Sequence, residues 1–458
     1  MDKSIFGIVI DARRAEKKGP DALHERQRRR LAELVNFART SSAFYKELYH
    51  RLPEYIESPE LLPVITKKEL MADFNNWVTD ARVTYEKTRD FLNDPERIGE
   101  RFLRKYLLTA TSGTTGYRGI FLLDDRSRAI NSAIGTRKLI KWLTYGDLLK
   151  LLTRGLRTAA VIATDDHLYG YAFLRQQQIY RRPLGRIIHI LSLHSPLPDL
   201  VDQLNTLSPA VLLGYACTIA QLAAEQKAKR LKIRPVLILV TGEMVLDTEY
   251  EEIARTFHAK IRDYYITTEA PELSYGCEYG WHHINSDWYI FEPVNKDYSP
   301  TPPGEVSHTV LLTNLTNRVQ PILRYDLGDS VLQRPDPCPC GSPLPAVRVR
   351  GRAAEVLVFP GQKGGEVRIV PLVFSTLLDR FRSIEQYQIV QTSPDTLHLR
   401  LRLGEDADPE TVWNRVFEKI TALLKAHEAG DIEILLSQEP PVPTPAGKYP
   451  TVIPFKTE

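Results

Sequence analysis

Four hydroxyl residues and two glycines fill six consecutive positions of this 458-residue chain, shortly after the apolar run Tyr106–Leu108. The six are Thr111, Ser112, Gly113, Thr114, Thr115 and Gly116. Glycines let a backbone approach a ligand closely, and hydroxyls with exposed backbone N–H groups donate hydrogen bonds to phosphate oxygens. The segment therefore predicts a phosphate-binding loop, with an ordinary surface loop as the alternative. It is not a Walker loop, because no Gly-Lys-Ser/Thr triplet follows.

Three cysteines and a histidine have the spacing of metal ligands. Cys277 lies six residues before His283, and Cys338 and Cys340 form a Cys-Pro-Cys-Gly turn. Three thiolates and one imidazole make up the tetrahedral set that zinc prefers in closed structural sites. His282 is an alternative to His283, and reduced cysteines without a metal are the alternative to a site. We expect a structural zinc that fixes a β subdomain to the larger sheet and has no open position for activating water.

The size and charge of the chain limit its possible functions. At 458 residues it has room for two or more domains. Its 60 basic and 57 acidic residues give a formal net charge of +3, which predicts no strong field for nucleic acid or an anionic membrane. The apolar runs are too short for a membrane span or a secretory signal, and four cysteines make no disulfide framework in so long a chain. We therefore expect a soluble, cytoplasmic protein.

The middle of the chain alternates between strand and helix patterns. Short apolar runs predict strands at residues 159–163, 210–213, 236–240 and 261–265. Helical spacing lies between them at residues 217–231 and 247–257. This alternation predicts crossover units on a largely parallel sheet. Ligands of such sheets bind at the carboxyl ends of the strands.

Smaller units are expected on both sides of this sheet. Residues 20–100 have a polar, helical pattern, and residues 286–350 predict short strands with proline-rich turns. Farther along, residues 387–403 predict a hairpin, 409–426 a helix and 432–436 a closing strand.

The expected fold class is therefore α/β in two parts. Residues 1–351 form a large N-terminal domain with mostly parallel sheets, a small β subdomain and a helical lead-in over residues 1–100. Residues 352–458 form a small, mobile α+β domain.

Further segments resemble, in the same order, the signature of the adenylate-forming superfamily of acid ligases, in particular its phenylacetate–coenzyme A ligase branch. The segments are Thr241-Gly242-Glu243, Tyr265-Ile266-Thr267-Thr268-Glu269, Arg324-Tyr325-Asp326-Leu327-Gly328-Asp329, Gly351-Arg352 and Pro445-Ala446-Gly447-Lys448. The hydroxyl-rich loop resembles the phosphate loop of the same family. The resemblance covers about residues 28–453.

The resemblance implies an ATP site for an AMP-binding domain. Gly242 and Glu243 contact adenine, and Tyr265 stacks on it. Glu269 supplies a hard oxygen ligand for Mg²⁺ beside the phosphates. Asp329 accepts hydrogen bonds from both ribose hydroxyls.

The resemblance also implies a moving catalytic residue, Lys448. Attack by a carboxylate on the α-phosphate of ATP brings two anions together, and a lysine between them offsets their repulsion where charge builds up. Arg352 opens the hinge between the domains, and Thr268 belongs to the ATP-binding segment. Rotation of the small domain then removes Lys448 and presents another face to the acyl acceptor.

The chain departs from the family pattern at four places. Tyr117-Arg118-Gly119 stands where many members have a lysine, with Arg118 as the remaining positive charge. Ile266 replaces a glycine. Ala354 and Glu355 replace an acidic pair at the hinge, and residues 359–365 replace a shorter loop that helps to form the pantetheine tunnel of relatives.

Together these features predict an AMP-forming acid–thiol ligase. A small carboxylic acid, aromatic in most of the branch, reacts with MgATP to give acyl-AMP and pyrophosphate, and the thiol of coenzyme A then takes the acyl group. The alternatives are another acceptor (an amine, a carrier-protein thiol or a hydroxyl), adenylyl transfer to a deazaflavin coenzyme, and a nucleotide-binding scaffold without turnover. ATP, Mg²⁺, coenzyme A and structural zinc are the expected cofactors. The helical lead-in offers a surface for a homodimer.

Overall fold

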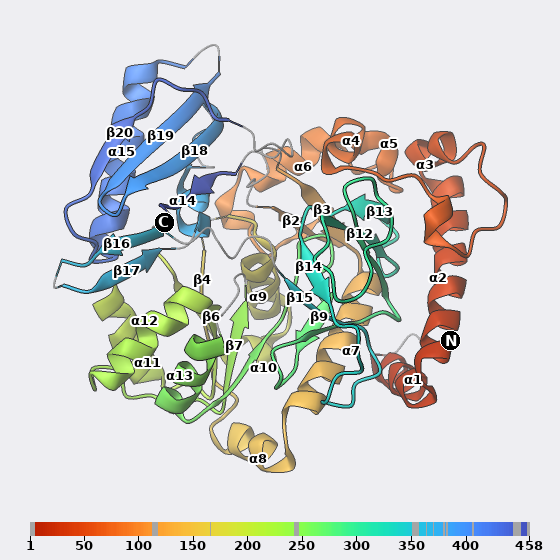
Figure 1. Cartoon of the computed structure of the whole chain (residues 1–458), viewed down its shortest axis with the longest axis horizontal. Coiled ribbons are helices and arrows are strands. Elements are labelled where there is room, and N and C mark those ends of the chain that lie inside the picture. The colour runs from red at the N-terminus through yellow and green to blue at the C-terminus, as the bar shows by residue number, and fades with distance from the viewer. Residues whose placement is uncertain are drawn as a thin grey trace.

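A computed structural model describes most of the chain. The described residues are 5–111, 118–164, 166–241, 247–349, 357–362, 364–369, 371–378, 381, 383–404, 407–442 and 450–455. Figure 1 shows a larger unit that ends near residue 349 and a smaller unit, drawn in blue, that lies at one corner of it.

A five-stranded parallel sheet forms one half of the larger unit, in the order β5-β4-β6-β7-β8. Its strands are β4 (Thr158–Ile162), β5 (Ile188–Ser192), β6 (Val211–Tyr215), β7 (Leu237–Thr241) and β8 (Lys260–Asp263). The crossover helices are α9 (Tyr169–Tyr180), α10 (Arg182–Gly185), α11 (Leu197–Leu207), α12 (Ala216–Lys227) and α13 (Asp247–Phe257). The predicted alternation is confirmed, and β5 is an additional edge strand.

Short antiparallel sheets form the other half of the larger unit, in the orders β1-β2-β3, β11-β12-β13 and β14-β15-β10-β9. Their strands are β1 (Arg101–Phe102), β2 (Tyr106–Ala110), β3 (Ile120–Leu123), β9 (Ser274–Gly276), β10 (His282–Ile284), β11 (Tyr289–Val294), β12 (Thr309–Asn314), β13 (Ile322–Asp326), β14 (Val331–Gln333) and β15 (Ala346–Val349). The α/β class is confirmed. In the described part of the larger unit, parallel pairing of strands is confined to the five-stranded sheet.

The helical lead-in packs on these antiparallel sheets. Its helices are α1 (Ile5–Lys18), α2 (Pro20–Ser41), α3 (Ala43–Leu48), η1 (Pro59–Leu61), α4 (Lys67–Ala72), α5 (Phe74–Trp77), α6 (Tyr85–Leu92) and η2 (Pro95–Arg97). Tyr45 and Trp77 both donate hydrogen bonds to the carbonyl of Pro321, at 2.8 and 2.7 Å. The lead-in therefore shares one core with the sheets.

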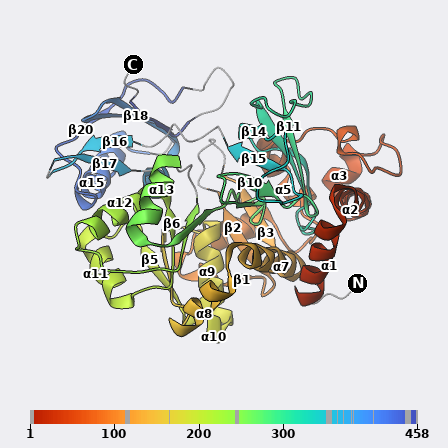
Figure 2. The ribbon, with the colours of Figure 1, turned by 60° about the horizontal axis from the view of Figure 1, so that its bottom comes forward.

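Two more helices follow the lead-in, α7 (Asp125–Trp142) and α8 (Tyr145–Thr153). Helix α1 packs beside α7 (Figure 1; Figure 2). No described helix has both the length and the apolar character needed to cross a bilayer.

The smaller unit has a core of its own. It contains β16 (Leu357–Pro360), β17 (Glu366–Ile369), α14 (Pro371–Leu378), β18 (Ile384–Ser393), β19 (Thr396–Leu403), α15 (Pro409–Ala426), β20 (Glu433–Leu436) and β21 (Val452–Ile453). The predicted hairpin is β18–β19, and the predicted helix is α15. Leu193, just after β5, and Tyr215, the last residue of β6, pack against this core. The smaller unit therefore contacts the carboxyl edge of the parallel sheet.

Candidate active site and metal centre

Tyr265 and Asp329, 64 residues apart in the sequence, meet beyond the end of β8. The Tyr265 hydroxyl donates a hydrogen bond to Asp329 Oδ2 at 2.6 Å. The Asp329 side chain is only 3% exposed, and the Tyr265 ring lies edge-on to Phe291 with centroids 6.3 Å apart. The phenol therefore fixes the orientation of a buried carboxylate, as recognition of a ligand diol by a carboxylate requires.

The backbone of Tyr265 is held by one serine. Ser274 Oγ, on β9, accepts a hydrogen bond from the Tyr265 N–H at 3.0 Å and donates one to the Tyr265 carbonyl at 2.8 Å. The backbone at Ile266 is not left-handed, so this position does not require glycine. The replacement of the family glycine by Ile266 is therefore compatible with an ordered loop.

Glu269 lies in the same loop and is also buried, at 5% exposure. Its Oε1 accepts a hydrogen bond from the Tyr325 hydroxyl at 2.9 Å and lies 3.5 Å from Lys67 Nζ. Asn314 Nδ2 donates to the Glu269 carbonyl at 2.7 Å, which fixes the backbone. Among the described residues both side-chain contacts go to Oε1, which leaves Oε2 for a cation.

These contacts join two short segments of the chain crosswise. Residues 265–269 follow β8, and residues 325–329 begin at the end of β13. The tyrosine of each segment donates to the acidic residue of the other: Tyr265 to Asp329, and Tyr325 to Glu269. Thr268, between Tyr265 and Glu269, is half-buried. The two contacts therefore bring two of the predicted site segments together, each with a buried carboxylate.

The ends of the predicted phosphate loop also meet. Thr111 donates its N–H to the Gly119 carbonyl at 2.9 Å, and its Oγ1 accepts from the Gly119 N–H at 2.8 Å. Arg118, expected as a remaining positive charge, forms an ion pair with Asp166, so its charge is already balanced. The remaining predicted ATP-binding and catalytic residues lie outside the described residues; these are Ser112, Gly113, Thr114, Thr115, Gly116, Gly242, Glu243, Arg352 and Lys448.

The four predicted metal ligands form a cluster whose ligand atoms all lie within 4.8 Å of one another. Cys277 follows β9, His283 lies on β10, and Cys338 and Cys340 lie in the turn between β14 and β15. The Sγ atoms of Cys277 and Cys338 are 3.8 Å apart, and Cys340 Sγ lies 3.1 Å from His283 Nε2. His282 is not in the cluster, since its Nε2 lies 3.3 Å from Asp263 Oδ2.

Comparisons with known proteins bear on the fold. No family model matches the chain. It is 23% identical over 419 residues to Protein CapK of Staphylococcus aureus, covering 88% of this chain and 82% of that protein. A structure of 2-hydroxyisobutyryl-CoA ligase, in complex with 2-HIB-AMP and CoA in the thioesterification state, matches with a TM-score of 0.58 and 19% identity over 95% of this chain and 89% of the other.

The chain has the adenylate-forming ligase fold. A second structure of the same ligase, in the postadenylation state with R3-HIB-AMP, matches with a TM-score of 0.54 and 18% identity. It covers 95% of this chain and 89% of the other chain. The fold predicted from the order of the sequence segments is therefore confirmed.

Within this adenylate-forming fold, the Cys/His cluster fits a metal ion. The Leu344 carbonyl accepts a hydrogen bond from His283 Nδ1 at 3.0 Å, so Nδ1 carries the proton and Nε2 presents its lone pair to the thiols. Burial raises the pKa of the Cys277 thiol to about 12, raises that of Cys340 and lowers that of His283. Thiols in such surroundings ionise when a divalent cation binds them. The donor set is closed and has the composition of a structural zinc site.

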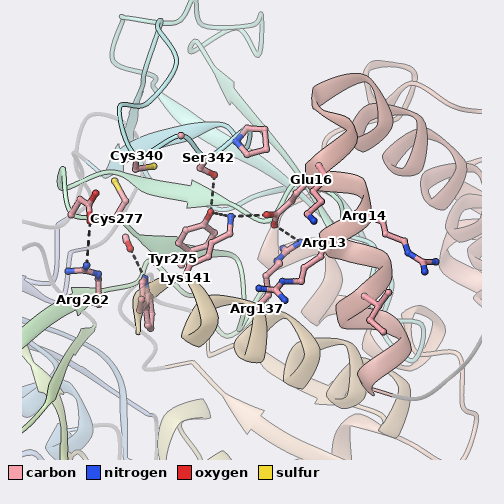
Figure 3. Close-up of a pocket in the computed structure, with 17 residues that line it drawn as sticks. Arg13, Arg14, Glu16, Arg137, Lys141, Arg262, Tyr275, Cys277, Cys340 and Ser342 are labelled. Atoms are coloured by element: carbon pink, nitrogen blue, oxygen red, sulfur yellow. Dashed lines mark hydrogen bonds and ion pairs between the residues drawn. The ribbon is translucent and has the colours of Figure 1, made fainter. Parts of the chain in front are cut away.

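A network of hydrogen bonds and ion pairs links this cluster to α7 and α1 (Figure 3). The Tyr275 ring stacks on His283, and its hydroxyl lies 2.9 Å from Ser342 Oγ. Lys141 Nζ donates to the Tyr275 hydroxyl at 2.6 Å and lies 2.9 Å from Glu16 of α1. These neighbours line a cavity of about 700 Å³ between α1, α7 and the turn that begins at Cys340.

Two residues of the candidate active site, Lys67 and Tyr325, were given no role by the sequence. Lys67 is the first residue of α4, which starts there because Thr66 and Glu69 form a reciprocal capping box. That pattern predicts a helix start at Lys67, but only the fold shows that its side chain reaches Glu269. Tyr325 lies inside a recognised segment, and strand alternation could have placed it on the face opposite Arg324 and Asp326.

Proposed function

We propose that the protein is an AMP-forming acid–coenzyme A ligase. The observation that carries this proposal is the crosswise pairing of residues 265–269 with residues 325–329, which buries two carboxylates in two segments that the family uses for ATP. The adenylate-forming fold supports it, because the solved ligase with this fold is in complex with 2-HIB-AMP and CoA.

In this proposal the ribose of ATP binds at Asp329. A buried carboxylate held by Tyr265 can accept hydrogen bonds from both hydroxyls of a diol without reorienting. Gly242 and Glu243 contact adenine, the Tyr265 ring packs against it, and the loop from Thr111 to Gly116 binds the phosphates. The two hydrogen bonds between Thr111 and Gly119 hold the two ends of this segment together.

In this proposal the Glu269 carboxylate would hold Mg²⁺, since its Oε2 has no other partner among the described residues. When bound, Mg²⁺ neutralises phosphate charge beside the reacting phosphorus. Tyr325 keeps the Glu269 carboxylate in place, and Lys67 balances its charge before the nucleotide arrives. A buried carboxylate without such partners would be costly.

Lys448 performs the catalytic step. Its proposed role is to offset the repulsion between the attacking carboxylate of the acid and the α-phosphate, and so to stabilise the charge of the transition state. The smaller unit carries this residue and contacts the carboxyl edge of the parallel sheet through Leu193 and Tyr215, which supports its approach to the nucleotide. The smaller unit then rotates about the hinge at Arg352, and the thiol of coenzyme A takes the acyl group.

The function is tested by trapping the activated acid with hydroxylamine. We expect hydroxamate and pyrophosphate when the protein is given MgATP and a suitable member of a panel of aryl, fatty and amino acids, with the aryl acids as the first choice. AMP release that requires both the acid and coenzyme A supports the proposed acceptor. ATP binding without pyrophosphate exchange on any acid of the panel would instead identify a nucleotide-binding scaffold.

The metal centre leads to a prediction about zinc content. We propose that the four ligands hold one structural zinc ion per chain, because all of them are soft or borderline donors in a closed set. Cys277→Ser should lower the zinc content of untagged protein to well below one per chain and lower the melting temperature by roughly 5 °C or more. Cys217→Ser, on α12, is the matched control and should retain zinc. Wild-type protein without zinc in elemental analysis would remove this proposal.

A further inference from the structure

Two histidines that are adjacent on β10 face different neighbours. His283 belongs to the Cys/His cluster, whereas His282 Nε2 lies 3.3 Å from Oδ2 of Asp263, the last residue of β8. The side chains of His282 and Asp263 are only 12% and 18% exposed. The sequence suggested His282 only as an alternative metal ligand, and the proposed reaction gives it no role.

The His282 ring also contacts a residue of the candidate active site. Its centroid lies 6.3 Å from that of the Tyr265 ring, and the two planes are inclined by 64°. Phe291, on β11, makes a second contact of the same kind with Tyr265, with centroids 6.3 Å apart and planes inclined by 83°. Edge-to-face pairs at such distances are attractive and depend on the direction of approach. The Tyr265 ring is therefore oriented by two aromatic neighbours, one from β10 and one from β11.

The position of His282 is fixed by the backbone around it. Strand β10 pairs with β9 on one side and with β15 on the other, and His282 stands opposite Gly276 and Val347. Asp263 approaches closely because Gly276 has no side chain: a Cβ at Gly276 would lie 1.9 Å from Asp263 Oδ1. The imidazole is therefore held from two directions, by an interior strand of its own sheet and by a carboxylate at the end of β8.

We propose that His282 is a positioning residue of the nucleotide site. Its ring keeps the Tyr265 ring in the orientation in which the phenol donates its hydrogen bond to Asp329. The inference rests on the proposed function, in which Asp329 accepts hydrogen bonds from both ribose hydroxyls. A hydrogen bond weakens steeply as its angle departs from linearity, so a Tyr265 ring that loses one neighbour orients Asp329 less well. His282 therefore acts on recognition of the ribose through Tyr265 and Asp329.

This role differs from a purely structural one in its effect on nucleotide preference. If His282 only stabilised the fold, its replacement would weaken the binding of all adenine nucleotides alike. If His282 acts through Tyr265 and Asp329, its replacement weakens mainly the binding of nucleotides whose sugar carries both hydroxyls. ATP and 2′,3′-dideoxy-ATP differ only in these hydroxyls. The ratio of their dissociation constants therefore separates the two roles.

The test is calorimetric titration of the full-length protein with ATP or 2′,3′-dideoxy-ATP, each with Mg²⁺ and without an acid. We expect the wild type to bind ATP more tightly. His282→Gln keeps a hydrogen-bond donor for Asp263 but removes the ring, and should lower the preference for ATP by roughly 3-fold or more. His282→Phe keeps a ring beside Tyr265 and should retain most of the preference. His308→Gln replaces an exposed histidine of the same unit and should bind as the wild type does.

Three outcomes would overturn the proposal. A wild-type preference for ATP that is unchanged in His282→Gln removes the role of His282 and leaves the proposed function standing. Equal losses in His282→Gln and His282→Phe would show that the ring beside Tyr265 is not what matters. A wild type that binds both nucleotides equally would remove Asp329 as the ribose carboxylate, and this inference with it. Circular dichroism reports whether each variant is folded, and His282→Leu, which also lacks the ring, replaces His282→Gln if that variant does not fold.

Discussion

Replacing Lys448 with alanine should slow acyl-adenylate formation by roughly 10²-fold or more. The proposed role of Lys448 is to offset repulsion between the acid and the α-phosphate, and this repulsion is greatest in the transition state. ATP affinity should therefore change much less than the rate. Pyrophosphate exchange in the presence of the acid measures this half-reaction directly.

The control for this variant is Lys419→Ala. Lys419 is an exposed residue of α15 in the same unit, so its removal changes the same net charge without touching the nucleotide. Transfer of the acyl group from preformed acyl-adenylate should remain near normal in Lys448→Ala, because the smaller unit has then rotated. Exchange at the wild-type rate in Lys448→Ala would refute the assignment.

The parallel sheet could be predicted because its strands are short apolar runs between helical segments. In Ala159–Val161 and Ile238–Val240 every residue is apolar, as expected for strands covered on both faces. Strand β5 was missed because it lies at the sheet edge: His189 interrupts its apolar run, and its last four residues are only half-buried. Edge strands carry a weaker sequence signal because one side faces solvent.

The Cys/His cluster shows where the sequence leaves a choice that the backbone resolves. Spacing alone allowed either His282 or His283 as the fourth ligand. Adjacent residues of a strand point to opposite faces, and on β10 only His283 faces the cysteines while His282 faces Asp263. Knowing which face of β10 meets the turn at Cys338 requires the sheet order, which the sequence does not supply.

The candidate active site could be predicted as a set of segments but not as a set of contacts. Glu269 and Asp329 stood out through their motifs, whereas the tyrosine that holds each carboxylate comes from the other segment. The sequence placed the backbone conformation of residues 265–269 in question, because the family has glycine where this chain has Ile266. The two hydrogen bonds between the Ser274 hydroxyl and the backbone of Tyr265 show another way to fix that loop.

Replacing Glu269 with glutamine should lower acyl-adenylate formation by roughly 10²-fold and raise the Mg²⁺ concentration needed for half-maximal rate. Glutamine keeps the size of the side chain, and its amide oxygen can still accept the hydrogen bond from Tyr325. What is lost is the negative charge that we propose binds the cation. The rate of hydroxamate formation as a function of Mg²⁺ concentration measures both effects.

Lys67 allows the charge of Glu269 to be separated from its structural role. In Glu269→Gln the ammonium of Lys67, 3.5 Å from Oε1 in the wild type, loses its partner, and an uncompensated charge near a buried group is destabilising. The double variant Lys67→Met/Glu269→Gln removes both charges. If Glu269 binds Mg²⁺, the double variant should regain thermal stability but remain as slow as Glu269→Gln. Recovery of the rate together with the stability would show that Glu269 serves only to balance Lys67.

Lys67→Met alone should lower the Mg²⁺ concentration needed for half-maximal rate, because the ammonium no longer competes with the cation for the Glu269 carboxylate.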